Sequence, residues 1–269
     1  MRLHLRRLIP GRPGAVPLVL VHGFTGDTTT WDALAPHLDP RRPAAAVDLV
    51  GHGRSPGPED PAAYTMRATV AAVVATLDAA GIARAHWLGY SMGGRVALRL
   101  ALDHPDRVVS LALVGASPGI DDPAARAERA RTDAALADGI LSAGLEAFVD
   151  RWMADPLFAT QARLGAARLA ASRAQRLRNR PHALALTLRG MGTGADAAVT
   201  DRLAGLAVPT LVVAGAEDGK FCAIAAAMAA RIPGARTAIV PGVGHAVHVE
   251  APAALADVVE AFLADVDPV

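Results

Sequence analysis

Short apolar runs alternate with longer stretches of helical periodicity along this 269-residue chain, and no other feature constrains its fold as strongly. The apolar runs predict buried strands at residues 16–22, 44–49, 85–90, 108–114, 210–214 and 237–240. The periodic stretches predict helices at residues 65–80, 92–102, 223–230 and 253–263. Apolar strands that alternate with helices are typical of a mostly parallel sheet with helices on both faces.

The alternation stops between residues 121 and 195. The pattern of this segment is helical throughout and contains no strand candidate. A chain of 269 residues fits one large domain with an insertion. We therefore predict a core formed by residues 1–120 and 196–269, and a helical lid formed by residues 121–195.

The sequence Gly89-Tyr90-Ser91-Met92-Gly93 places a serine between a predicted strand and a predicted helix. A G-x-S-x-G pattern in this setting predicts a nucleophile elbow, where small flanking residues are needed because the turn is tight and strained. The alternative is an ordinary glycine-rich turn whose serine caps the helix. We expect Ser91 to be an activated catalytic serine.

An activated serine needs a base, and the base needs an acid that orients it. Asp218 and His245 each follow a predicted strand, at the edge where parallel α/β sheets place their sites. Glu217 and His248 are their neighbouring competitors. The Gly-x-Gly-His context favours His245, and the position after the strand favours Asp218.

Two backbone amides are expected to stabilise a developing oxyanion. The segment His22-Gly23-Phe24 follows an early strand and offers the amide of Phe24. The residue after the serine offers the amide of Met92. These donors, together with the chain order of serine, acid and histidine, predict the α/β-hydrolase fold.

Composition and charge exclude several classes of function. The formal net charge of +1 gives no electrostatic basis for binding nucleic acid or an anionic membrane. Cys222 is the only cysteine, which excludes an intrachain disulfide and a cysteine-based metal site. No run has the length of a membrane span or the apolar centre of a signal peptide. We expect a cytoplasmic enzyme, monomeric or weakly homo-oligomeric, that acts without a metal or cofactor.

Longer segments carry a more specific resemblance. The most discriminating are RAERARTD at 126–133, DRWMADPLF at 150–158 and EDGKF at 217–221, with support from LRGMGTG at 188–194 and GHAVHVE at 244–250. VHGFTGDTTTW at 21–31 and GYSMGGRVAL at 89–98 occur more widely. Over nearly its full length the chain resembles the MenH-type 2-succinyl-6-hydroxy-2,4-cyclohexadiene-1-carboxylate synthases of menaquinone biosynthesis, within the α/β-hydrolase superfamily.

The resemblance implies a lyase rather than a hydrolase. Members of that family remove a proton from a ring carbon of the substrate, and 2,5-elimination expels its enolpyruvyl group as pyruvate. The substrate carries three carboxylates, so cationic side chains are implied at the site. Carried over position by position, the resemblance assigns substrate-binding roles to Tyr90, Arg95, Arg129, Trp152, Phe158, Arg176 and Lys220.

The arginine assignments have a competing interpretation. Residues 156–195 contain seven arginines and no acidic residue, a composition that also suits the solvated face of a lid. Arg95 and Arg129 lie inside recognisable motifs, and Lys220 is the only lysine among 27 basic residues. The spacing to Asn179 favours Arg176 over Arg178, and this choice stays open.

Two other functions compete with the lyase. In a hydrolase of esters, thioesters or carbon–carbon bonds, Ser91 acts as a covalent nucleophile. In a non-catalytic module of the same fold, the pocket only binds a carboxylated ligand. The complete triad disfavours the module, because non-catalytic relatives usually lack one of its members.

Overall fold

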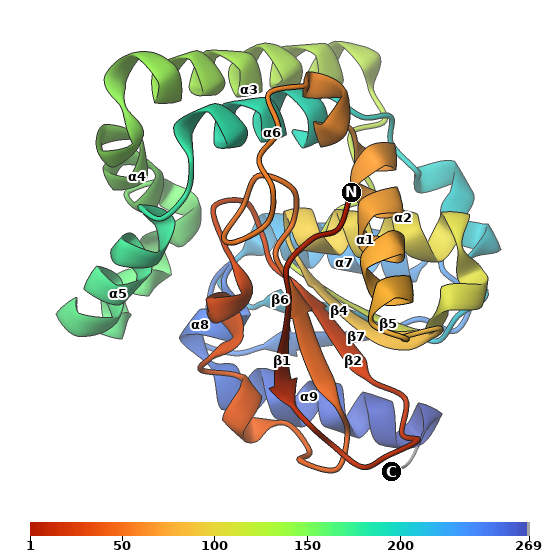
Figure 1. Cartoon of the computed structure of the whole chain (residues 1–269). Helices are drawn as coiled ribbons and strands as arrows, with labels where there is room; N and C mark the ends of the chain where they lie inside the picture. The colour runs from red at the N-terminus through yellow and green to blue at the C-terminus, as the bar shows by residue number, and fades with distance from the viewer. Residues whose placement is uncertain (268–269) are drawn as a thin grey trace.

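A seven-stranded sheet runs through the computed structural model, which describes residues 1–267, in the order β1-β3-β2-β4-β5-β6-β7 (Figure 1). The strands are β1 (Leu5–Ile9), β2 (Leu18–Val21), β3 (Ala44–Val47), β4 (Ala85–Tyr90), β5 (Val108–Val114), β6 (Thr210–Gly215) and β7 (Arg236–Val240). Strands β2 to β7 pair in parallel, and β1 pairs antiparallel with β3. The predicted mostly parallel sheet is confirmed, and all six predicted strands are present.

Strand β1 has no counterpart among the predicted strands. Its sequence LRRLI is only half-buried and contains two arginines, so it lacks the apolar signal of the inner strands. An edge strand pairs on one side only and tolerates charged residues. Arg6 forms an exposed ion pair with Asp32 at 2.6 Å.

Each face of the sheet is covered by its own helices. On β2, Val19 and Val21 belong to one buried cluster, and Leu18 and Leu20 belong to another. The first cluster packs under α1 (Met66–Ala79), α2 (Met92–Asp103) and α7 (Gly219–Ala229), and the second under α8 (Val247–Glu250) and α9 (Pro252–Val266). Because both faces are buried, the inner strands are apolar throughout. Short 3-10 helices connect these elements at Thr28–Trp31 (η1), Ala35–His37 (η2), Pro61–Tyr64 (η3), Pro105–Arg107 (η4) and Thr200–Gly205 (η6).

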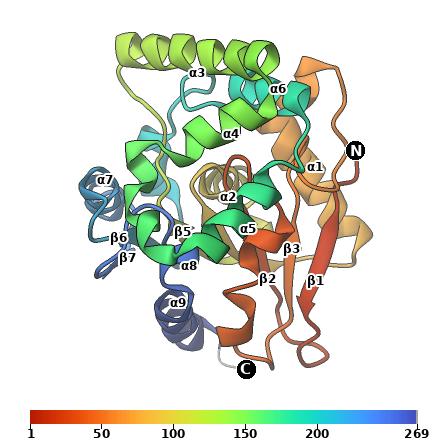
Figure 2. The ribbon, with the colours of Figure 1, turned by 90° about the vertical axis from the view of Figure 1, so that its left-hand side faces the viewer.

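Between β5 and β6 the chain forms only helices. They are α3 (Pro123–Ala143), α4 (Leu145–Met153), the 3-10 helix η5 (Pro156–Leu164), α5 (Ala166–Arg176) and α6 (Pro181–Met191), which we call the helical layer. In both views this layer lies beyond the carboxyl ends of the parallel strands, with α3 and α6 side by side (Figures 1 and 2). It has its own buried cluster, which includes Ile140, Phe148 and Leu184. The predicted lid boundaries at 121 and 195 enclose these helices and remain a prediction about domains.

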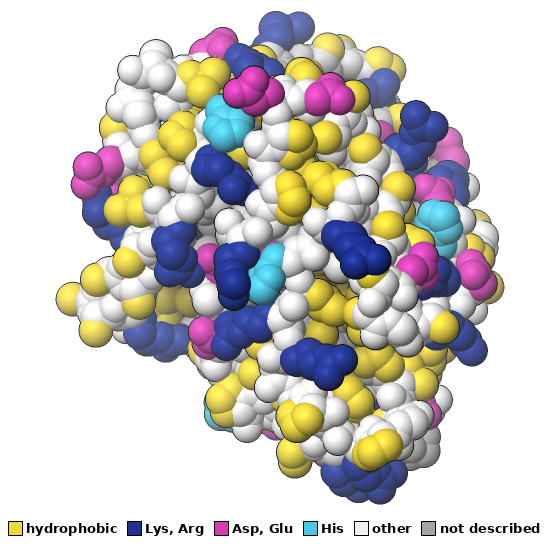
Figure 3. All heavy atoms as spheres, in the orientation of Figure 1, with side chains coloured by type: hydrophobic (Ala, Val, Ile, Leu, Met, Phe, Trp, Pro, Cys, Tyr) yellow, Lys and Arg dark blue, Asp and Glu magenta, His cyan; other side chains and the backbone are white. Residues whose placement is uncertain are grey.

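The described residues place limits on other kinds of site. Within residues 1–267 no helix combines the length and the apolar character needed to cross a bilayer. Over the same range, no group of three or more His, Cys, Asp or Glu side chains is arranged to hold a metal ion. On the face seen in Figure 3, basic side chains are interspersed with acidic and apolar ones and do not form one continuous basic patch.

Candidate active site

Ser91 occupies a strained turn between β4 and α2. Its φ is +51°, in the left-handed region that side chains other than glycine rarely adopt. The turn needs small neighbours, because a Cβ on Gly89 would lie 2.6 Å from the Gly93 carbonyl oxygen, and one on Gly93 would lie 2.2 Å from that of Val21. The Ser91 side chain makes no capping hydrogen bond to α2. This geometry matches a nucleophile elbow and contradicts the alternative of an ordinary serine cap.

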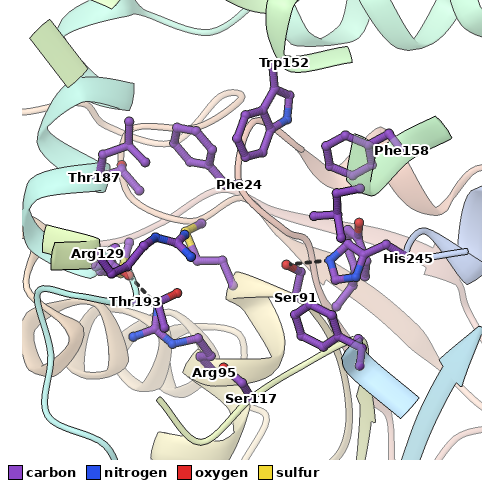
Figure 4. A pocket seen from close by; sticks show the side chains of 18 of the residues that line it. Phe24, Ser91, Arg95, Ser117, Arg129, Trp152, Phe158, Thr187, Thr193 and His245 are labelled. Atoms are coloured by element: carbon purple, nitrogen blue, oxygen red, sulfur yellow. Dashed lines mark hydrogen bonds between the residues drawn. The ribbon is translucent and has the colours of Figure 1, made fainter. Parts of the chain in front are cut away.

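His245 lies between Asp218 and Ser91, and Figure 4 shows its ring pointing toward the serine. The Nε2 atom of His245 is 3.2 Å from the Ser91 Oγ, and its Nδ1 atom is 2.8 Å from the Asp218 Oδ2. The other Asp218 oxygen accepts a hydrogen bond from the Phe221 amide at 3.1 Å. A carboxylate beside Nδ1 keeps that nitrogen protonated, so Nε2 is free to accept the serine proton.

The environment of Asp218 favours its charged form. Burial by itself would raise the pKa of Asp218, but hydrogen bonds from His245 and from the Phe221 amide hold that pKa below its ordinary value. Glu217 and His248, the two competing residues, make other contacts. Glu217 is exposed and pairs with Arg163 at 2.7 Å, and His248 is buried with its ring 4.1 Å from that of Tyr90. Burial lowers the pKa of His248 to about 3, so this ring is neutral.

Ser91 and His245 open onto a cavity of about 150 Å³ beneath the helical layer. Both predicted oxyanion residues, Phe24 and Met92, line it. A Cβ built on Gly23 would lie 3.4 Å from the Ser91 Cβ, so the loop that carries the Phe24 amide runs beside the serine. The other predicted residues that line this cavity are Tyr90, Arg95, Arg129, Trp152, Phe158 and Lys220.

Aromatic side chains from the helical layer form the roof of this cavity. Trp152 at the end of α4 contacts Phe24 and Phe158, with ring centroids 5.5 Å apart in each pair. The buried indole nitrogen of Trp152 has no hydrogen-bond partner among residues 1–267. Lys220 is exposed at the rim, with its Nζ 5.9 Å from the Phe221 ring centroid.

Two arginines lie across the cavity from His245 (Figure 4). Arg95 on α2 donates from Nη1 to the Met191 carbonyl at 2.6 Å and has no carboxylate partner among the described residues. Burial lowers the pKa of Arg95 to about 10, which still leaves it charged at neutral pH. Arg129 on α3 donates from Nε to the Asp133 Oδ1 at 2.8 Å. This side of the cavity therefore suits an anionic group.

Arg176 lies outside this cavity. It lines an adjacent cavity of about 730 Å³, which shares Phe24 and Tyr90 as a wall with the first. Arg178 lines the same space but donates to Asp27 at 2.7 Å and to the Thr29 hydroxyl at 2.9 Å. Arg176 has no carboxylate partner within residues 1–267, and burial lowers its pKa. Among the described residues, Arg178 is thus held by a carboxylate and Arg176 is not, and which of the two binds a ligand stays a prediction.

The structure adds pocket residues that the sequence patterns did not single out. Ser117 follows β5, Thr187 lies on α6, and Thr193 follows α6; all three line the cavity. Ser117 lies in the loop after a parallel strand, a position that is itself a signal for a site. Thr187 lies on α6 just before the segment LRGMGTG, and no motif includes it.

Three comparisons place the chain among known proteins. The sequence profile of the alpha/beta hydrolase fold family matches residues 16–252. A Bacillus subtilis (strain 168) protein provisionally named 2-succinyl-6-hydroxy-2,4-cyclohexadiene-1-carboxylate synthase is 38% identical, over 93% of this chain and 90% of its own length. The Salmonella agona (strain SL483) protein of that name is 33% identical, over 96% of this chain and 97% of its own. The solved structure of MenH from S. aureus has a TM-score of 0.91 at 32% identity, with 98% of each chain covered.

Proposed function

This chain belongs to the alpha/beta hydrolase fold family and, within it, to the 2-succinyl-6-hydroxy-2,4-cyclohexadiene-1-carboxylate synthases, and from that premise we propose how it performs their reaction. The chain is a lyase of menaquinone biosynthesis that eliminates pyruvate from 2-succinyl-5-enolpyruvyl-6-hydroxy-3-cyclohexene-1-carboxylate. The observation that carries the proposal is one cavity with Ser91 and His245 on one side and Arg95 and Arg129 on the other. A simple ester substrate has no need of the arginines.

Ser91 is the proposed base for the ring proton. With Nδ1 of His245 bound to Asp218, Nε2 takes the hydroxyl proton of Ser91 across 3.2 Å. The serine oxygen then removes the proton from ring C2, next to the succinyl ketone. The C3–C4 double bond shifts to give the 2,4-diene, and the bond from C5 to the enolpyruvyl oxygen breaks. The departing enolate takes the proton held by His245 and becomes pyruvate, so protons and electrons balance.

The amides of Phe24 and Met92 stabilise the charge that develops during proton removal. As the C2–H bond breaks, negative charge moves onto the succinyl ketone oxygen. Both amide-bearing residues line the cavity beside Ser91. Loss of one preorganised donor of this kind typically costs about 3–4 kcal/mol of transition-state stabilisation.

Arg95 and Arg129 bind carboxylates of the substrate. A hydrogen bond to a charged group contributes about 1.5–3 kcal/mol net, so two supply about 3–6 kcal/mol. Micromolar affinity corresponds to about 8 kcal/mol, and the aromatic roof formed by Trp152 and Phe158 supplies further contact. Tyr90, Arg176 and Lys220 complete the proposed binding residues, with Arg176 reached through the adjacent cavity.

The test is pyruvate release by the purified protein from the enolpyruvyl precursor, followed with a coupled dehydrogenase. The wild type releases pyruvate in step with diene absorbance, and Ser91→Ala loses this activity by at least about 10³-fold. The matched control is Ser142→Ala, which changes an exposed serine in the helical layer. No release above background by the wild type overturns the proposal.

The second candidate is a serine hydrolase. The strained turn at Ser91 and its hydrogen bond to His245 favour it, because both features also activate a covalent nucleophile. A hydrolase reacts readily with a fluorophosphonate and shows a burst on an activated ester. A protein that labels slowly and releases pyruvate quickly is a lyase.

We also propose a cytoplasmic location and a monomeric or weakly homo-oligomeric state. A substrate with three carboxylates does not cross a bilayer unaided, so the enzyme must work where that substrate is made. Sedimentation of the purified protein and fractionation of its host test these two points.

A further inference from the structure

The loop that carries the Phe24 amide contains a second strained residue. Thr25 has a φ of +66°, and a β-branched residue in this left-handed region is a genuine outlier. Its side chain is fully buried, and its hydroxyl has no partner among the described residues. Such a conformation persists only where the surrounding structure holds it in place. The question is which contacts hold this loop.

Two side-chain amides, one on α5 and one in the connection between α5 and α6, hold the Thr25 carbonyl. Asn179 donates to it from Nδ2 at 2.9 Å, and Gln175 donates from Nε2 at 3.2 Å. The second Nδ2 hydrogen of Asn179 bonds the Arg176 carbonyl, also at 2.9 Å. Asn179 is buried, and both hydrogens of its side-chain amide bond to backbone carbonyls.

The other side of the same loop is fixed from the core. The Gly23 carbonyl lies 2.7 Å from the His22 Nδ1 and accepts a hydrogen bond from the Gly26 amide at 3.0 Å. The Leu49 amide donates to the His22 Nε2 at 3.0 Å, so Nδ1 carries the ring proton and donates to Gly23. In a trans peptide the amide hydrogen points away from the preceding carbonyl oxygen. Holding the Gly23 carbonyl thus sets the direction of the Phe24 N–H.

We propose that Asn179 is a positioning residue for the oxyanion donor at Phe24. His22 fixes the start of the loop, and Asn179 fixes its strained residue one position after the donor. The contact joins the helical layer to the catalytic loop, so the amide is aimed correctly only when this part of the layer is docked. This inference rests on the proposed function, because it assumes that an oxyanion develops beside Phe24.

Two substitutions at Asn179 test the proposal. Asn179→Ala removes the donors, and Asn179→Asp keeps the shape but sets carboxylate oxygens against two carbonyls. A misplaced transition-state contact lowers kcat with little change in KM, and displacement by about 1 Å costs on the order of 10²-fold. We expect kcat for pyruvate release to fall by about 10- to 100-fold in both variants, with KM within about threefold of the wild type.

Arg180→Ala is the matched control. Arg180 is the next residue and donates to a core carbonyl, that of Ser55, and among the described residues it makes no hydrogen bond to the loop of residues 22–27. We expect its kcat to stay within about threefold of the wild type. An equal loss of kcat in Arg180→Ala and Asn179→Ala overturns the proposal, because general docking of the layer then explains both.

Hydrogen exchange gives a readout that does not depend on turnover. The peptide that covers residues 23–27 should exchange faster in Asn179→Ala than in the wild type or in Arg180→Ala. Unchanged exchange together with unchanged kcat overturns the proposal. If the wild type releases no pyruvate, the proposed function fails, and the exchange experiment still decides whether Asn179 holds the loop.

Discussion

Replacing Arg95 with methionine separates substrate binding from fold stability. Arg95 is a cation in the wall of the cavity, fixed by one hydrogen bond to the Met191 carbonyl and without a carboxylate partner in the described chain. Burial lowers its pKa to about 10, which shows that the fold disfavours its charge. Methionine keeps much of the volume and suits a helix.

The expected effect follows from the hydrogen bonds that are lost. A net contribution of about 1.5–3 kcal/mol for a bond to a charged group corresponds to about 10- to 150-fold in affinity, at about 1.4 kcal/mol per decade. Because the carboxylate is bound equally in the ground state and the transition state, the loss should appear in KM, with kcat within about threefold. The free energy of unfolding should stay within about 1 kcal/mol, since the charge that is removed is one that its surroundings disfavour.

Pyruvate-release kinetics and denaturant unfolding of the same preparations measure both quantities. Arg99→Met is the matched control, because Arg99 lies one turn further along α2 and already pairs with Asp196 at 2.7 Å. Its KM should match that of the wild type. A KM in Arg95→Met within about twofold of wild type refutes a carboxylate-binding role for this arginine. A large fall in kcat at constant KM would show instead that Arg95 acts on the reacting bond.

Other changes test the acid, the buried histidines and the elbow. Asp218→Asn should lower kcat by about 10³- to 10⁴-fold through the wrong His245 tautomer, and Glu217→Gln should change it less than about twofold; equal losses would contradict the assignment of the acid. His248, with a pKa of about 3, binds no proton in the folded state near pH 5, whereas the unfolded chain does below about 6.5. The free energy of unfolding should therefore be highest above pH 6.5 and fall toward pH 3 by up to about 1.4 kcal/mol per pH unit. In urea titrations, His248→Phe should show a smaller dependence of this free energy on pH. Gly89→Ala should lose more than about 2 kcal/mol or fail to fold, because its Cβ would lie 2.6 Å from a carbonyl oxygen; Gly219→Ala, which meets nothing within 4 Å, should be neutral in the same assay.

The geometry of Ser91, His245 and Asp218 was predictable because local patterns specify it. The glycines around Ser91 are required by contacts under 3 Å, so the chain has little freedom there. Asp218 and His245 follow parallel strands, and the sheet brings the ends of those strands together. The helix after Asp218 begins at Gly219, earlier than the predicted residue 223, because the Asp218 side chain also caps it. A cap of this kind is hard to separate from a catalytic acid by pattern alone.

Residues of the helical layer were harder to place. Their sequence pattern gives helices, but the direction in which each side chain points depends on how those helices dock on the core. Arg176 and Arg178 are two positions apart and line the same cavity, yet within residues 1–267 only Arg178 pairs with a carboxylate there, that of Asp27. Asn179, which donates to the Thr25 carbonyl, has no motif that marks it. Local sequence periodicity does not predict long-range contacts of this kind.

The central claim is that Ser91 removes a proton and does not form an acyl-enzyme. Single-turnover reaction of the wild type with the enolpyruvyl precursor tests it, with pyruvate and diene followed by absorbance and the intact protein mass measured at each time. We predict one pyruvate per diene and no mass increase on the protein at any time. A covalent adduct on Ser91 that forms and decays at the rate of turnover, or diene without pyruvate, would contradict the claim.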